Sequence, residues 1–409
     1  MSAHRPRLKE IFNTAVIVAA LGYFVDIYDL ILFSIVRIPS LRDLGLTPQQ
    51  ITDQGLLLLN VQMFGMLLGG ILWGILGDKK GRIQLLFGSI LLYSVANIAN
   101  GFVQSIEMYA VLRFIAGVGL AGELGGGITL VSEIMPKETR GYGTMIIATV
   151  GVAGAVLAYN IVEHFDWRNA YFIGGGLGLA LLVLRVSVFE SGMFNAMKET
   201  KVKRGDFIGL FNHKERFYRY MKCVFIGLPT WYCVGILITL SPEFAKHLAI
   251  DGTVSAGRMV MFFYLGLIPG DFLSGVLSQI FHSRRKILAT FLLLNALGMI
   301  VYFLSSGITA EHFYYVSFFL GLSAGYWAIF VTNAAEQFGT NMRATVATTV
   351  PNMARGATIP ISLAYAFASS TLGTLAGAAV VGVICLAIAM YALYHLDETF
   401  GKDLDFVEN

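Results

Sequence analysis

Several charged side chains lie deep inside long apolar stretches of the 409-residue sequence. Asp26 and Asp29 are three residues apart, so they share one face of a helix, and Arg113 lies at a comparable depth in another apolar stretch. A charged side chain at the centre of a membrane-spanning helix costs about 2.5–3.5 kcal/mol on insertion scales, so these groups need a specific reason to be there. We expect Arg113 to pair with one of the two aspartates, either at a proton-coupling site or as a permanent structural salt bridge.

A third acid, Glu123, stands among small residues. Four glycines near it leave this face of the helix without large side chains: Gly119, Gly122, Gly126 and Gly127. Another helix can therefore approach closely, or a cavity can open. Helix packing alone explains the glycines but does not explain the glutamate. We expect Glu123 to carry a proton, as Asp26 and Asp29 do.

Arg355 is the buried base of the second half of the chain. Thr348 and Asn352 precede it on the same helix face, and two prolines in this stretch are expected to loosen the helix and free backbone groups for a ligand. An arginine that faces a cavity suits a carboxylate or a phosphate. The alternative is an arginine neutralised by Glu123 or another acid. The two arrangements can also alternate, if protonation of the acid releases the arginine.

Four aromatic residues lie in the middle of apolar stretches and are either walls of a substrate cavity or packing residues: Trp231, Tyr232, Tyr326 and Trp327.

The three cysteines have no metal-ligand or paired spacing, so we expect small buried hydrophobes and no metal site. No phosphate-cradling loop is followed by Lys-Ser or Lys-Thr, so ATP-driven pumping has no support. We predict neither a cofactor nor an enzymatic activity.

The elements that position these residues are long apolar segments. Apolar residues make up 56% of the chain and charged residues only 13%, against roughly 25% charged in soluble proteins. The sequence predicts an all-α membrane protein, because about 20 apolar residues at 1.5 Å rise cross the bilayer. Twelve transmembrane helices are expected, at residues 11–36, 55–77, 83–104, 106–132, 142–164, 167–189, 219–244, 257–280, 287–307, 311–335, 343–371 and 373–396.

The predicted helices divide into two six-helix bundles, residues 1–189 and 219–409, joined by a polar linker at 190–218. Glu133 and Arg140 recur at matching positions as Glu336 and Arg343, which favours duplicated, pseudo-symmetric halves. The linker and the loops on its side hold most of the lysines and arginines, so both termini are expected in the cytoplasm. The expected outer loops hold only five basic residues, Arg37, Arg42, Arg168, Lys246 and Arg258.

Short sequence motifs resemble those of a known protein family. Residues 74–83 read GILGDKKGRI, between two charge-free apolar runs, and this segment resembles the loop between helices 2 and 3 of the major facilitator superfamily. Arg113 and Gly117 reproduce that superfamily's span-4 motif, in which the arginine is associated with proton coupling. The resemblance implies the major facilitator fold of two rocking bundles.

Within the superfamily, the sequence looks most like the metabolite:proton symporter branch, near the sugar and organic-ion porters. The similar segments are FVDIYDL (24–30), GELGG (122–126), ESGMF (190–194) and ETFGK (398–402). Asp26 stands where the branch has Glu, Leu124 where it has Trp and Gly192 where it has Pro, and these departures bear on the substrate more than on the fold. The proline-containing motif of drug antiporters is absent from the fifth span.

The resemblance also implies a cytoplasmic gate, formed by Asp78, Arg82, Glu133, Arg140, Glu336 and Arg343. Partly exposed ion pairs are each worth about 0–1 kcal/mol. A few of them suit a conformational equilibrium that must shift in both directions.

Together these features predict a secondary active transporter of a bacterial inner membrane that imports a small metabolite, an organic acid, with protons by alternating access. Its expected partners are the small-molecule substrate, protons and the lipid bilayer, with no nucleic acid, and we expect a monomer. One alternative is a transporter that binds a cationic substrate or a metal ion with the core acids. Another is a membrane receptor that does not transport.

Overall fold

The computed structural model describes residues 13–80, 82–135, 140–189 and 210–402. In these ranges the chain is helical throughout, apart from one isolated bridge between Asp251 and Thr309. An N-terminal group of helices comprises α2 (Thr14–Asp43), α3 (Pro48–Lys80), α4 (Arg82–Asn100), α5 (Ile106–Leu120), α6 (Glu123–Ile134), α7 (Arg140–Val152), α8 (Gly154–His164) and α9 (Trp167–Phe189). The all-α class expected from the sequence is confirmed for the described residues.

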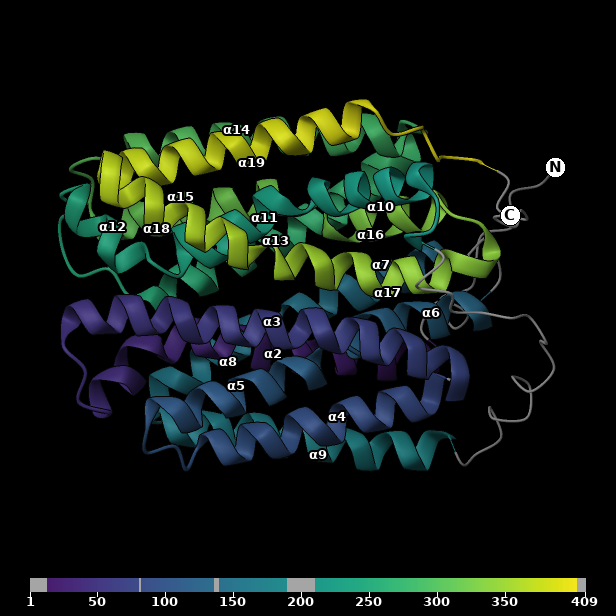
Figure 1. Cartoon of the computed structure of the whole chain (residues 1–409), viewed down its shortest axis with the longest axis horizontal. Coiled ribbons are helices and arrows are strands. Elements are labelled where there is room, and N and C mark those ends of the chain that lie inside the picture. Colours follow the sequence, from purple (N-terminus) through teal and green to yellow (C-terminus); the bar gives the residue numbers. More distant parts are fainter. Residues whose placement is uncertain (1–12, 81, 136–139, 190–209, 403–409) are drawn as a thin grey trace.

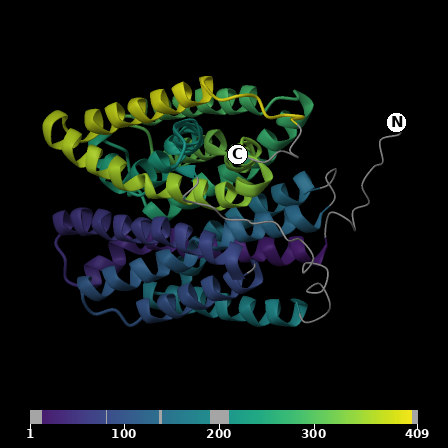
Figure 2. The same ribbon diagram turned by 45° about the vertical axis from the view of Figure 1, so that its right-hand side comes forward.

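A C-terminal group of helices completes the molecule. It comprises α10 (Lys214–Ile226), α11 (Leu228–Tyr232), the π-helix η2 (Cys233–Ile238), α12 (Ser241–His247), α13 (Ala256–Ile280), α14 (Arg284–Leu304), α15 (Ala310–Ala324), α16 (Trp327–Glu336), α17 (Thr340–Gly356), α18 (Thr358–Leu372) and α19 (Thr374–Tyr394). The N-terminal group forms one layer and the C-terminal group the other (Figure 1), and the layers stay separate in the turned view (Figure 2). Contacts between α17 and both α3 and α6, and between α13 and α2, α7 and α8, join the layers.

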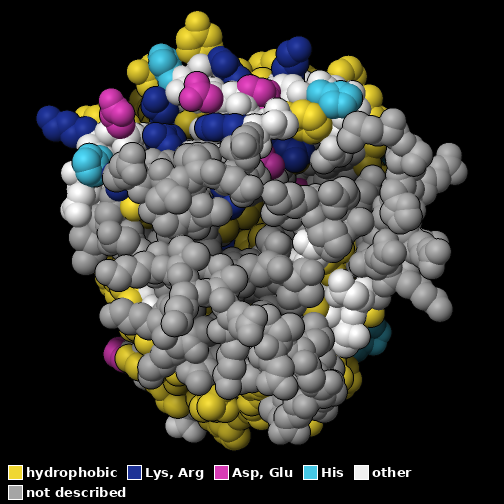
Figure 3. Space-filling model, turned by 90° about the vertical axis from the view of Figure 1, so that its right-hand side faces the viewer, with side chains coloured by type: hydrophobic (Ala, Val, Ile, Leu, Met, Phe, Trp, Pro, Cys, Tyr) yellow, Lys and Arg dark blue, Asp and Glu magenta, His cyan; other side chains and the backbone are white. Residues whose placement is uncertain are grey.

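Two ends of the molecule are used as landmarks below. The terminal end is where α2 begins and α19 finishes, on the right of Figure 1, and the distal end is where α2 finishes and α19 begins. Figure 3 looks onto the terminal end. The described charged side chains on this face gather mainly in its upper part, with hydrophobic side chains above them and along the lower edge of the view. Such an apolar rim suits contact with lipid.

Nine helices in the described ranges are long and apolar enough to cross a membrane. A tenth is added if α10 and the segment Leu228–Ile238, which meet at 42°, form one span. Two further predicted spans are shorter: Leu85–Asn100 is apolar, and the expected span 343–371 consists of α17 and α18, with 17 and 15 residues. The count of twelve spans and the cytoplasmic position of the termini stay predictions.

The predicted linker, residues 190–218, lies mostly outside the described residues. Its last part does not match the prediction, because α10 begins at Lys214 rather than at residue 219. The division into two six-helix domains, residues 1–189 and 219–409, stays a prediction.

Five of the predicted spans are interrupted near their middle. The interruptions separate α5 from α6, α7 from α8, α10 from α11, α15 from α16, and α17 from α18. Glycine or proline stands at several of them, which is the usual cause of a helix break. At Gly325 the glycine is required, because an added Cβ would lie 2.4 Å from the backbone of Gly270. The breaks bring free helix ends and their polar groups to the middle of the molecule.

Candidate functional site

A small cavity lies between the two groups of helices. Its volume is about 20 Å³, which is room for one water molecule. The lining comes from α2, α7, α11, η2, α13, α16 and α17, and consists of Tyr23, Ile27, Val152, Thr230, Trp231, Val234, Phe263, Tyr264, Leu267, Trp327 and Arg355. The walls are therefore mainly aromatic and aliphatic, with one guanidinium group. In this conformation the cavity is closed around a volume smaller than a metabolite.

Arg355 and Asp26 form the ion pair beside this cavity. Arg355 Nη2 lies 3.7 Å from Asp26 Oδ2, and both side chains are buried. This separation is too long for a hydrogen bond, and neither oxygen of Asp26 has a hydrogen-bond partner in the described part of the chain. The guanidinium also lies 5.8 Å from the ring of Trp231 and donates to Asn352 Oδ1 at 3.4 Å. Of the predicted alternatives, the structure shows Arg355 beside an acid, and that acid is Asp26, not Glu123.

Asp29 and Arg113 are neighbours without a direct ion pair. No nitrogen of Arg113 lies within 4.0 Å of the Asp29 carboxylate, although the charge of Arg113 acts on it. Arg113 donates instead to Asn97 Oδ1 at 2.7 Å and lies 4.8 Å from the ring of Tyr171. Asp29 fits against Gly174, where an added Cβ would be 2.3 Å from its Oδ1. Arg113 therefore lies near Asp29 as predicted. Its hydrogen-bond partner, Asn97, was not predicted from the sequence.

Glu123 has a strong partner that the sequence analysis did not name. Arg185 donates to both carboxylate oxygens, at 3.2 Å and 2.8 Å, and Ser89 Oγ donates to Oε1 at 2.9 Å. Both members of the pair are buried, and Glu123 is not among the cavity-lining residues. Arg185 is a charge inside the predicted span 167–189, and that signal could have identified it.

The glycines around Glu123 serve close packing. A Cβ at Gly119 would lie 2.6 Å from the Tyr93 backbone, and one at Gly122 would lie 2.8 Å from Ser89 Cβ. Both contacts are with α4, so the first of the predicted alternatives, close approach of another helix, is what the structure shows. The glycines also leave room for Ser89 to reach the carboxylate.

The polar stripe before Arg355 joins the two layers. Asn352 Nδ2 donates to the carbonyl of Ala121, at the break between α5 and α6, at 2.8 Å. Thr348 packs on Gly125, where an added Cβ would lie 2.6 Å from its side chain. Neither residue lines the cavity. Their contacts are those of an interface between layers, with Asn352 also orienting Arg355.

The four predicted aromatic residues divide into two pairs. Trp231 and Trp327 line the cavity, their ring centroids are 6.0 Å apart, and neither indole N–H has a hydrogen-bond partner in the described ranges. Tyr232 donates to the carbonyl of Ala378 at 2.5 Å, and Tyr326 to that of Ile226 at 3.0 Å. The two tyrosines are packing residues, so the cavity-wall alternative is wrong for them here.

Asp271 has a structural explanation. Its Oδ1 accepts from the backbone N–H of Ala328 at 3.1 Å, in the first turn of α16. An acid at this position satisfies an amide that the break before α16 leaves without a helical partner.

Most of the predicted cytoplasmic gate is not described. The side chains of Asp78, Arg82, Glu133 and Arg140 lie outside the described residues. Glu336 is described and pairs with Arg284 at 3.4 Å rather than with Arg343, which is half-buried near the start of α17. Glu336 also accepts from Thr399 Oγ1 at 2.8 Å.

The neighbouring Glu398 docks the end of the described chain onto α14. Its carboxylate accepts from Ser283 Oγ and from the backbone amides of Arg284 and Arg285. Burial opposes ionisation, but these hydrogen bonds outweigh it and hold the pKa of Glu398 below its usual range. The ETFGK segment therefore fastens the chain to α14 and α16 at the terminal end.

The distal end is closed by contacts between the layers. Arg37 of α2 donates to Glu243 of α12 at 2.7 Å and to the carbonyl of Thr239 at 3.1 Å. Tyr159 of α8 accepts from Arg258 of α13 at 3.2 Å. The prediction that Arg37 lies in an outer loop is wrong: it is inside α2 and fully buried.

Comparisons with known proteins agree with this architecture. The family described as Major Facilitator Superfamily matches residues 19–361. The chain is 27% identical over 394 residues to the putative niacin/nicotinamide transporter NiaP of Bacillus subtilis, covering 91% of this chain and 92% of the relative. It is 26% identical over 400 residues to the probable 4-methylmuconolactone transporter of Cupriavidus pinatubonensis, covering 93% and 89%. The crystal structure of a D-xylose-proton symporter superposes with a TM-score of 0.72 at 16% identity, covering 95% of this chain and 99% of that one.

Proposed function

Since the chain belongs to the Major Facilitator Superfamily of membrane transporters, we propose that it is a proton-coupled importer of a small organic acid in a bacterial inner membrane. The observation that carries the proposal is the loose pair between Arg355 and Asp26 at the cavity wall. A buried guanidinium with an acid at 3.7 Å and few hydrogen bonds can exchange that acid for another carboxylate.

The exchange has a simple charge balance. A substrate carboxylate that binds Arg355 displaces Asp26, and a displaced carboxylate in a water-poor cavity is stabilised by taking up a proton. The loaded site then holds the Arg355–substrate pair and a neutral Asp26. When the substrate leaves, Asp26 releases its proton and returns to Arg355. One carboxylate and one proton therefore move together.

The cavity walls fit an organic acid with an apolar body. The indole N–H groups of Trp231 and Trp327 have no described partner, and unpaired buried donors favour an acceptor atom on the ligand. The remaining walls are aromatic or aliphatic. Two relatives are named for small compounds with a ring, niacin/nicotinamide and 4-methylmuconolactone, which supports a cargo of this size.

The other charged groups receive separate roles in the proposal. Asp29, with Arg113 nearby, is a second proton site, because its oxygens have no hydrogen-bond partner in the described ranges. Glu123, expected from the sequence to carry a proton, has the contacts of a structural pair with Arg185. The six predicted gate residues at the terminal end stay part of the proposal as a cytoplasmic latch.

Counterflow in proteoliposomes tests the proposal, with nicotinate and benzoate as probes. The wild-type protein is expected to exchange at least one of them, and a pH gradient is expected to drive its accumulation. Arg355→Ala removes a charge-assisted hydrogen-bonding group and should slow counterflow by roughly 10- to 100-fold. Arg355→Lys, which keeps the charge without the planar fork, should retain an intermediate rate.

Other outcomes would support the alternatives. Uptake of an organic cation that survives Arg355→Ala but is lost in Asp26→Asn would indicate a cation transporter using the core acids. Binding of a ligand without flux in liposomes would indicate a receptor. Either result contradicts the organic-acid proposal.

A further inference from the structure

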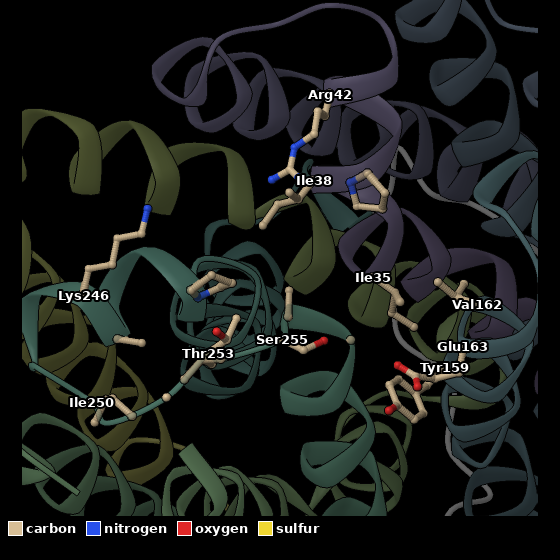
Figure 4. A pocket seen from close by; sticks show the side chains of 17 residues that line it. Ile35, Ile38, Arg42, Tyr159, Val162, Glu163, Lys246, Ile250, Thr253 and Ser255 are labelled. Carbon is tan, nitrogen blue, oxygen red and sulfur yellow. The ribbon is translucent and has the colours of Figure 1, made fainter. Parts of the chain in front are cut away.

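A second, larger pocket lies at the distal end, between the two layers. Its volume is about 530 Å³, within the roughly 300–1,000 Å³ of small-molecule sites. The walls come from α2, α8, α12 and α13 and from the segment between α12 and α13 (Figure 4). Arg42, Lys246 and Thr253 on its walls are exposed, whereas the residues that line the central cavity are buried. The distal pocket is large enough for a metabolite.

One side of this distal pocket is basic. The guanidinium of Arg42 and the ammonium of Lys246 are directed toward the space between them in Figure 4, while Glu163 lies beside Tyr159 on the other side. Neither Arg42 nor Lys246 has an ion-pair partner in the described part of the chain. These two cations, one from α2 and one from α12, raise the local concentration of anions.

The remaining surface of the pocket is suited to the apolar part of such an anion. Ile35 and Val162 line the part near Glu163, while Ile38 lies next to Arg42 (Figure 4). Ile250 lies below Lys246, and Thr253 and Ser255 lie near the middle of the view. A cationic wall, hydroxyl donors and an aliphatic wall together match a carboxylate with a hydrocarbon body.

The distal pocket and the central cavity lie on one route. On α2, Ile27 lines the cavity and Ile35 the pocket, and eight residues of helix advance ~12 Å. On α13, Phe263 lines the cavity and Gly257 the pocket, a step of ~9 Å. Two helices from different layers thus give similar spacings and the same direction.

A closed contact separates the two spaces. Gly257 touches the opposite layer, where an added Cβ would lie 3.0 Å from Ile35 and 3.1 Å from Tyr159. The hydrogen bond from Arg258 to Tyr159 joins α13 to α8, and the ion pair between Arg37 and Glu243 joins α2 to α12. A ligand in the distal pocket therefore lies immediately outside this contact.

We propose that the distal pocket is a second, outer binding site for an organic carboxylate, held by Arg42 and Lys246 about 10 Å from the central site. The proposal rests on the proposed function, because it assigns the same class of substrate to both sites. The outer site binds the acid while the distal contact is closed and supplies it to Arg355 when the layers separate.

The charge of the pocket can be measured without any transport. Thr253→Cys places a thiol at the pocket wall, where residue 253 is exposed, while the three native cysteines are buried. In the full-length protein, anionic methanethiosulfonate ethylsulfonate should react faster than its cationic ammonium counterpart. Adding Arg42→Gln and Lys246→Gln should lower the anion-to-cation rate ratio by roughly three- to tenfold, and the control Glu163→Gln should raise it. An unchanged ratio in the double variant overturns the basic site.

Protection of the same thiol tests binding, with nicotinate and benzoate as probes. At least one of them should slow labelling of Cys-substituted residue 253. The protection should persist in Arg355→Ala and disappear when Arg42 and Lys246 are both replaced by Gln. Protection that is lost in Arg355→Ala but kept in the Gln variants overturns the outer site and leaves the central-site proposal intact. No protection in any protein also overturns the outer site, and counterflow then decides the proposed function separately.

Discussion

The two buried acid–base pairs of this protein are built differently. Glu123 and Arg185 share two hydrogen bonds, Ser89 adds a third, and all three residues belong to the N-terminal group of helices. Asp26 and Arg355 come from different layers and lie 3.7 Å apart, and Arg355 lines the central cavity. In the first pair both carboxylate oxygens accept hydrogen bonds, whereas neither oxygen of Asp26 has a hydrogen-bond partner in the described ranges.

The difference shows how a buried charge can serve structure or exchange. Removing one member of a well-bonded buried pair leaves an uncompensated charge, so such a pair resists rearrangement. A pair without hydrogen bonds loses much less when another carboxylate replaces the acid. The number of hydrogen bonds, and not burial, separates Glu123 from Asp26, and on this difference we propose a structural role for the glutamate and an exchange role for the aspartate.

The largest effect is expected at the satisfied pair. Arg185→Gln leaves Glu123 buried with one hydroxyl donor, and should reduce stability by about 3–5 kcal/mol. Thermal or denaturant unfolding in detergent measures this. Asp26→Asn serves as the matched control and should cost clearly less, because it removes no hydrogen bond. Equal losses in the two variants would remove the distinction between the pairs.

An intermediate effect on stability is expected at Asn97, the residue that holds Arg113 beside Asp29. Asn97 accepts the hydrogen bond of Arg113 that could otherwise go to Asp29. Asn97→Ala should cost about 1–3 kcal/mol, because a buried guanidinium N–H loses its acceptor. Asn97→Asp, which keeps an acceptor, should restore most of the stability. If Asn97→Ala is as stable as the wild type, Arg113 is not held by this bond.

The smallest effect is expected at the hydroxyl that supports Glu123. Ser89→Ala removes one of three hydrogen bonds and should cost about 0.5–1.5 kcal/mol. The rate of counterflow should stay at the wild-type level, since the pair lies away from the cavity. A large drop in proton-driven accumulation at unchanged stability would return Glu123 to the role of proton carrier.

The sequence was sufficient to identify charged residues whose burial in a membrane span costs free energy at any depth. Asp26, Asp29, Glu123 and Arg355 were identified by the cost of burying a charge, and all four are buried. Their pairing could not be predicted, because it depends on how far each helix is rotated and broken. Asp26 faces Arg355 only across the interface between layers.

Charges near the ends of predicted spans were judged less well. The sequence analysis places Arg37 in an outer loop and does not name Arg185, since a long basic side chain near a span end normally reaches water. In the fold both are enclosed by helices that extend beyond the apolar run, and each finds a glutamate. The division of the aromatic residues between cavity and packing likewise depends on the face that each helix turns inward.

Proton uptake on binding tests the exchange at Arg355 most directly. Purified protein is titrated with nicotinate or benzoate in weakly buffered solution with a pH indicator, alongside Asp26→Asn. The wild-type protein should take up about one proton for each carboxylate bound, and Asp26→Asn should bind the carboxylate with no proton uptake. Equal proton uptake in Asp26→Asn, or binding to the wild type without any uptake, would contradict the account.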